Sequence, residues 1–171
     1  NGADPNHKLN KSFIGPILLC VYLDVPFYIK MLLEFKAVIT SQDLTTALLN
    51  ENDVIINCLM KGPFEEQKDG SVLIAALNTG RVDLVRKLLD LGVVASRLDR
   101  FGLTPLSVAC KMGNLQAVLL LKSFAEQREF PELLSWAIYS GNPEVVSLIL
   151  EMGADPSAYN RLGVLLLFMK T

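Results

Sequence analysis

Residue types that could carry acid–base or nucleophilic chemistry are sparse in this chain. His7 is the only histidine among the 171 residues. It could serve as a general base or be an exposed loop histidine. A Ser-His-Asp or Cys-His arrangement would need another histidine in a core segment. Glu65 and Glu66 could form paired acids, but adjacent carboxylates in a polar loop are usually solvated. We therefore expect no catalytic centre in this chain.

The sequence shows no pattern for binding a metal or a nucleotide. Cys20, Cys58 and Cys110 are spread too widely for a zinc spacing, and an odd number of cysteines argues against a full disulfide framework. Gly62 and Gly70 are not part of a phosphate-binding loop of the form G-x-x-x-x-G-K-[ST]. We expect no metal, cofactor or small-molecule substrate. Small buried thiols are typical of a reducing compartment, cytoplasmic or otherwise intracellular.

Three recurring glycines organise the chain from about residue 71 onward. Gly80 and Gly113 are 33 residues apart, and Gly141 follows after another 28. Each glycine comes after a short apolar segment with small residues and before a second apolar segment spaced at i, i+3 and i+4. This pattern predicts a helix, a tight turn and a second helix in every unit. The segment before Gly113, residues 104–109, reads Thr-Pro-Leu-Ser-Val-Ala, with a capping threonine and a first-turn proline.

These segments resemble the ankyrin repeat. Its signature is T-P-L-H-x-A at a period of about 33 residues, and Ser107 stands in place of the histidine. Residues 75–92 and 136–156 resemble further copies, and the loop 96–103 aligns without gaps on 157–164. In the first third of the chain only the apolar spacing indicates repeats, over residues 15–21, 27–34, 44–49 and 54–60. The resemblance implies an all-α solenoid of stacked helix-turn-helix repeats with short β-hairpin fingers. A two-helix repeat of another family is the alternative that the 28-residue spacing leaves open.

The register divides the chain into repeats of one domain, 1–171. Asn1-Gly2-Ala3-Asp4-Pro5-Asn6 resembles the end of a repeat, and Leu165 to Met169 resembles a first helix without its second. We therefore expect a piece of a longer ankyrin-repeat protein. The predicted units are a partial repeat at 1–10, repeats at about 11–40, 41–68, 69–98, 99–126 and 127–158, and a partial repeat at 159–171.

Composition excludes several classes of partner. The net charge is −2 and no basic stripe occurs, so we expect no nucleic-acid binding. The longest apolar run near an end, Val164 to Met169, is far shorter than the roughly 20 residues of a membrane span. The hydrophobic content of 51% fits helices that pack on neighbours from both sides.

The resemblance also indicates where a partner protein would bind. Ankyrin proteins usually hold partners on a concave face built from fingers and first helices. We expect fingers around 97–103 and 158–164, and exposed pairs just before the glycines. Phe101 and Leu162 could instead pack onto their own fingers, and Trp136 could be a core residue or a stacking platform. The predicted partner-binding residues are Arg97, Asp99, Arg100, Phe101, Leu103, Lys111, Met112, Tyr139, Tyr159, Arg161 and Leu162.

Two functions follow from the resemblance. The first is a protein–protein interaction scaffold that binds a partner of unknown identity through this face, without catalysis. The second is a regulatory or targeting arm of a larger enzyme or channel, docking intramolecularly. The sequence of these 171 residues alone does not separate the two hypotheses.

Overall fold

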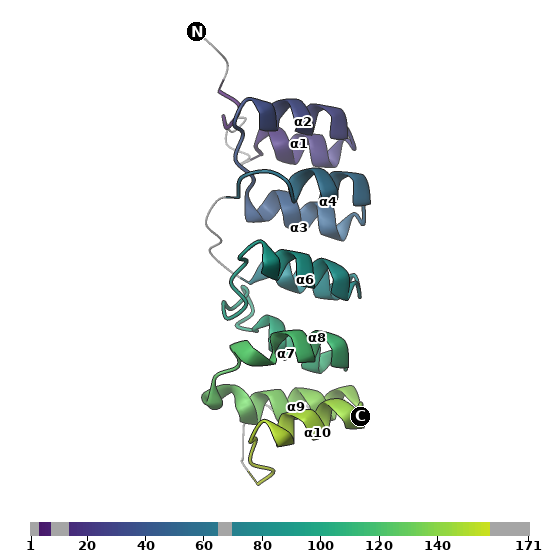
Figure 1. Ribbon diagram of the computed structural model, residues 1–171, viewed down its shortest axis with the longest axis vertical. Coiled ribbons are helices and arrows are strands. Elements are labelled where there is room, and N and C mark those ends of the chain that lie inside the picture. The colour runs from purple at the N-terminus through teal and green to yellow at the C-terminus, as the bar shows by residue number, and fades with distance from the viewer. Residues whose placement is uncertain (1–3, 8–13, 65–69, 158–171) are drawn as a thin grey trace.

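The computed structural model describes residues 4–7, 14–64 and 70–157, and these form helix pairs stacked along one long axis (Figure 1). The pairs follow chain order, and each first helix contacts the first helix of the next pair. The α-helices are α1 (Pro16–Tyr22), α2 (Pro26–Glu34), α3 (Ser41–Leu49), α4 (Asp53–Leu59), α5 (Ser71–Asn78), α6 (Val82–Asp90), α7 (Pro105–Lys111), α8 (Leu115–Leu121), α9 (Phe130–Ser140) and α10 (Pro143–Glu151).

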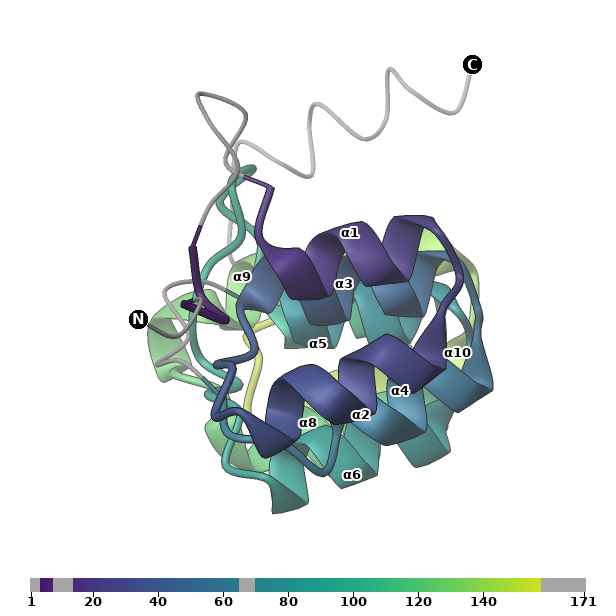
Figure 2. The same ribbon diagram turned by 90° about the horizontal axis from the view of Figure 1, so that it is seen from above.

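Seen along the stack, the helices separate into two layers (Figure 2). The first helices α1, α3 and α5 lie in one layer, and the second helices α2, α4 and α6 lie in the other. Contacts between α7 and α9, and between α8 and α10, continue the two layers toward the last pair. This is the predicted all-α solenoid of helix-turn-helix units.

The inner first helices α3, α5 and α7 are buried from both sides because each contacts the first helices of the preceding and the following pair. In α7 every residue from Pro105 to Cys110 is buried, and only Lys111 is exposed. The second helices bury one stripe instead. In α6 Leu84, Val85 and Leu88 are buried while Arg86 and Lys87 face solvent. This difference accounts for the high hydrophobic content of the chain.

The turn between the helices of a pair has the same backbone conformation throughout the stack. Gly80, Gly113 and Gly141 have φ of 70°, 65° and 75°, as the glycine spacing predicts. The earlier pairs keep this conformation without glycine, since Asp24 has φ of 55° and Glu51 has φ of 52°. Non-glycine residues adopt positive φ at a cost, so the stacked architecture imposes the turn on these positions.

Side chains at the start of the second helices connect neighbouring pairs. Asn142 caps α10 by accepting from the Glu144 N–H at 3.0 Å, and its amide donates to the Gly113 carbonyl at 2.8 Å. Asn52 caps α4, and its amide donates to the side-chain carboxylate of Asp24. Arg81, at the start of α6, pairs with Asp53 of the preceding unit. These polar links tie the turns into a column along one edge of the stack.

The loop at 97–103 is a tight turn rather than the two-stranded finger that the sequence predicts. Asp99 N–H donates to the Leu103 carbonyl at 2.9 Å, and Asp99 Oδ1 accepts from the N–H groups of Phe101 and Leu103 at 2.8 and 2.9 Å. The aspartate satisfies donors that a second strand would otherwise take. No strand is assigned anywhere in the described residues, and the second predicted finger at 158–164 lies outside them. The short segment between α8 and α9 contains two 3₁₀ turns, Lys122–Phe124 and Gln127–Glu129.

Candidate functional site

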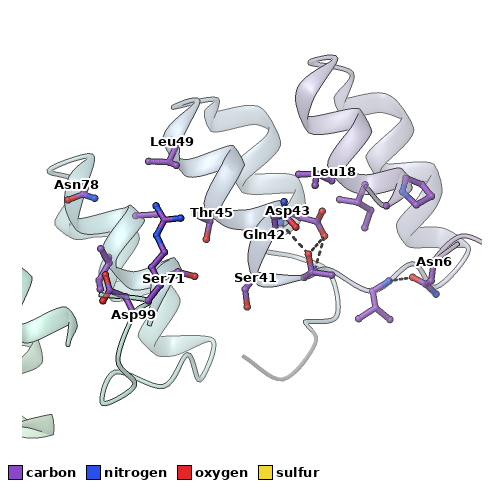
Figure 3. A pocket seen from close by; sticks show the side chains of 18 of the residues that line it. Asn6, Leu18, Ser41, Gln42, Asp43, Thr45, Leu49, Ser71, Asn78 and Asp99 are labelled. Carbon is purple, nitrogen blue, oxygen red and sulfur yellow. Dashed lines mark hydrogen bonds between the residues drawn. The ribbon is translucent and has the colours of Figure 1, made fainter. Parts of the chain in front are cut away.

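A groove of about 1060 Å³ runs along the layer of first helices (Figure 3). Its floor comes from α1, α3 and α5, and the turn at 99–101 forms part of its wall. Its lining is a mixture of apolar and uncharged polar side chains, and Asp43, Asp99 and Arg100 are its charged residues. Among the residues that line it are Leu18, Gln42, Thr45, Leu49, Ile74 and Asn78 from the helices, and Asp99, Arg100 and Phe101 from the turn.

One helix position recurs on this face in every pair. It lies two residues before the residue with positive φ, at the end of the first helix. Leu49 and Asn78 occupy it in α3 and α5 and line the groove. By register, the same position on the other first helices carries Tyr22, Lys111 and Tyr139. We call these five residues, Tyr22, Leu49, Asn78, Lys111 and Tyr139, the concave row.

Arg100 and Phe101 stand together at the wall of the groove. The Arg100 guanidinium lies 4.8 Å from the centroid of the Phe101 ring, a cation–π distance. Phe101 is 71% exposed, so it does not bury itself against its own loop as one alternative proposed. The two side chains therefore present a cation and an aromatic ring to solvent beside α5.

The other predicted loop residues, Arg97, Asp99 and Leu103, are half-buried. Leu103 is half-buried and packs against the hydrophobic core. Asp99 lines the groove, but its Oδ1 accepts two backbone hydrogen bonds within the turn. Arg97 is half-buried and does not line the groove. Of the five loop residues, Arg100 and Phe101 have the exposure that a partner contact requires.

A second cluster lies between α7 and α9. Lys111 Nζ is 5.0 Å from the centroid of the Trp136 ring, and the Trp136 and Tyr139 rings meet edge to face at 5.9 Å. Trp136 Nε1 donates to Glu132 at 3.2 Å. Trp136 is only 8% exposed, which supports a core residue over a stacking platform. Met112 is 43% exposed at the end of α7. Lys111 and Met112 are thus exposed near one edge of this cluster, and Tyr139 is half-buried against the core.

The buried carboxylate of Asp43 and the buried cysteine thiols show no sign of reactivity. Asp43 is 4% exposed, and its carboxylate accepts from the Thr40 N–H and hydroxyl, both at 2.8 Å, in a capping box. Burial raises the pKa of Cys110 from 9.0 to about 12 and also raises the pKa of Cys20. A thiol with a raised pKa stays protonated near neutral pH and is a poor nucleophile. Cys20, Cys58 and Cys110 are all free and buried, as predicted.

Sequence reasoning missed most of the groove. Its helical lining comes from α1, α3 and α5, and the predicted pairs before the glycines included only Asn78 of this lining. The sequence offered no turn residue to count back from in the first two pairs, because Asp24 and Glu51 occupy the positions that glycine marks in the later pairs. Tyr159, Arg161 and Leu162 lie outside the described residues.

Similarity to known proteins fits this architecture. A family model described as ankyrin repeats, in three copies, matches residues 37–129 and 74–160. The chain belongs to the ankyrin-repeat family. The match includes α3 to α10. It therefore covers α3 and α4, the helix pair that only apolar spacing indicates in the sequence.

Two curated ankyrin-repeat proteins illustrate the range of relatives. The ankyrin repeat, SAM and basic leucine zipper domain-containing protein 1 of Eulemur macaco macaco is 30% identical over 107 residues, which are 57% of this chain. This chain spans about a fifth of that relative, 22% of its length. The putative ankyrin repeat protein FPV223 of fowlpox virus (strain NVSL) is 33% identical over 118 residues, 66% of this chain and 73% of the viral protein.

A solved structure shows the same fold. The ankyrin repeat domain of Bcl-3, a member of the IκB protein family, superposes with a TM-score of 0.65 at 20% identity. The superposition covers 96% of this chain and 86% of the Bcl-3 chain. Ankyrin repeats are in general protein–protein interaction modules, and this chain has their architecture. No helix in the described part of the chain is both long and apolar enough to cross a membrane.

Proposed function

We propose that this ankyrin-repeat domain is a protein-binding module that holds a partner protein on its first-helix face. The observation that carries the proposal is the groove over α1, α3 and α5, with exposed Leu49 and Phe101 at its borders. Leu49 is 60% exposed and Phe101 is 71% exposed. Large apolar side chains beside a preformed hollow give binding energy at small ordering cost. The domain works in this account by recognition and not by catalysis.

The concave row extends the proposed surface beyond the groove. Lys111 and Tyr139 continue it over α7 and α9, where Met112 adds a further exposed apolar side chain. Tyr159, Arg161 and Leu162 remain part of the proposal as the next loop of the repeat. The three free cysteines support a reducing, intracellular compartment as the place where the module acts.

A second candidate function is docking within a longer protein. It is favoured by the relatives that join ankyrin repeats to SAM and basic leucine zipper domains in one chain. In that case the same face would hold another domain of the same polypeptide. The groove and the concave row would be used in either function, so the two differ in the identity of the partner.

Affinity capture with matched variants tests the proposal. The full chain serves as bait in source-cell lysate beside a Leu49→Asp, Arg100→Glu double variant, which changes two exposed groove residues. Arg86→Glu on the exposed side of α6 is the control. We expect a protein that the wild type and the control retain and the groove variant loses. Equal capture by all three proteins would refute binding through this face.

A further inference from the structure

We propose that the groove recognises an extended, acidic segment of its protein partner, with a carboxylate of that segment paired to Arg100. This assignment rests on the proposed function and adds the chemistry of the ligand. It follows from the charges on the first-helix face, from the polar groups along the groove and from the dimensions of the helix layer.

Two cations on this face have no carboxylate partner in the described structure. Arg100 is exposed, and within the described residues its recorded contact is the Phe101 ring, with no carboxylate. Lys111 likewise contacts the Trp136 ring. An aromatic face positions a cation without neutralising it. Both cations therefore keep their hydrogen-bond donors free for an acidic ligand.

The carboxylates on the same face are already engaged. Asp43 is buried and bonded to Thr40, and Asp99 Oδ1 accepts two backbone N–H groups of its own turn. Glu132 accepts from the Trp136 indole. Helices α1 and α5 carry no charged residue at all. In the described groove a basic peptide would find only Asp99 Oδ2 outside these hydrogen bonds, whereas an acidic peptide finds the guanidinium of Arg100 and then the ammonium of Lys111.

Uncharged side chains favour an extended backbone in the ligand. Gln42 and Asn78 line the groove with exposed amides that have no recorded hydrogen bond in the described structure. Each amide offers a donor and an acceptor, which match the free N–H and C=O groups of an extended chain. A helical ligand would satisfy those groups internally and leave the two amides unused.

The spacing of the layer sets the length of the segment. Packed helices lie about 8–10 Å apart, and an extended chain rises about 3.3 Å per residue. About three ligand residues therefore span each step between first helices, and about six cross from α1 to α5. An apolar ligand side chain within that stretch would contact Leu49, Ile74 or Phe101, which border the same hollow.

Selection from a library of random nine-residue peptides displayed on phage tests the assignment with the full chain as target. The sequences retained by the wild type are compared with those retained by Arg100→Glu and Arg86→Glu. A synthetic copy of the strongest sequence is then titrated against each protein. Arg100→Lys preserves the charge, and unchanged thermal melting of every variant controls for folding.

The assignment predicts enrichment of Asp or Glu in the selected peptides. The affinity of the synthetic peptide falls at least about tenfold for Arg100→Glu, changes less than about twofold for Arg86→Glu, and weakens with rising salt. Replacing the key peptide carboxylate by its amide weakens wild-type binding but adds little loss on Arg100→Glu, because the two changes remove one interaction.

Two other results are decisive against the assignment. Peptides selected without acidic enrichment, or bound equally by Arg100→Glu, overturn the charge pairing while leaving the groove as a protein-binding site. If the wild type selects no peptide at all, an extended segment is not the ligand, and the proposed function then rests on lysate capture alone.

Discussion

The side-chain amide of Asn142 donates to the backbone carbonyl of Gly113 at 2.8 Å, across 29 residues of sequence. The same asparagine caps α10 by accepting from the Glu144 N–H. One residue therefore starts a helix and links it to the turn of the preceding pair. Hydrogen bonds of this kind between successive pairs contribute to the stability of the stack, because each unit contacts only its neighbours.

Asn142→Asp separates the two roles of this residue. The carboxylate keeps the capping acceptor but loses the donor to Gly113, so we expect a loss of about 1–2 kcal/mol in the free energy of unfolding. Asn114→Asp is the control, since Asn114 caps α8 by accepting from the Ala117 N–H and has no recorded link to the preceding turn. Urea unfolding measures both variants. Equal losses would show that the link to Gly113 contributes nothing.

The turn positions without glycine predict stabilising substitutions. Lys36 follows α2 with φ of 63°, and Glu51 follows α3 with φ of 52°. We expect Lys36→Gly or Glu51→Gly to raise the unfolding free energy by about 1 kcal/mol, because the left-handed conformation costs other residues about 1–2 kcal/mol. Gly80→Ala is the reverse experiment, and a Cβ there meets no atom within 4 Å, so only backbone strain opposes it. A higher melting temperature for Gly80→Ala would contradict the account.

Two threonines of the same region predict opposite effects of one substitution. Thr45 Oγ1 is buried without a hydrogen-bond partner in the described structure, whereas Thr40 Oγ1 belongs to the capping box with Asp43. Thr45→Val should leave the stability unchanged or raise it by up to about 1 kcal/mol, and Thr40→Val should lower it by about 1–2 kcal/mol. Thermal melting compares the two. Destabilisation by Thr45→Val equal to that by Thr40→Val would mean that its hydroxyl is satisfied.

The raised pKa of Cys110 predicts alkaline destabilisation. Burial raises this pKa from 9.0 to about 12, so the folded state holds the proton over a range in which the unfolded chain releases it. The corresponding stability is fully present below pH 9 and is lost as pH rises toward 12, by at most about 1.4 kcal/mol per pH unit. Cys110→Ala should flatten the pH dependence of unfolding between pH 8.5 and 10.5. The same slope in both proteins would contradict burial of the thiol.

Much of the fold could be predicted where the sequence retains turn residues. Gly80, Gly113 and Gly141 located the turns of three pairs, and the predicted capping threonine and first-turn proline, Thr104 and Pro105, begin α7. The first two pairs were visible only as apolar spacing, because Asp24 and Glu51 occupy the glycine positions. Packing with the rest of the stack imposes the positive φ at such residues, and the local sequence does not predict it.

The candidate site was harder to predict than the fold. Arg100 and Phe101 were expected at the binding face, and their exposure supports that expectation without testing it. The helical lining of the groove depends on which side of α1, α3 and α5 faces the hollow, and the stacking of neighbouring pairs decides this. The loop at 97–103 is a tight turn instead of the predicted finger because Asp99 Oδ1 accepts from two N–H groups of its own turn, which the length of the loop does not reveal.

The most direct test of binding through the first-helix face is site-specific photo-crosslinking. The photoreactive residue p-benzoylphenylalanine replaces Asn78 in the concave row, or Arg86 on the exposed side of α6 as the matched control, in the full chain exposed to source-cell lysate. The account predicts that a partner protein becomes covalently joined through position 78 and not through position 86. Crosslinking through position 86 alone, or equally through both positions, would contradict it.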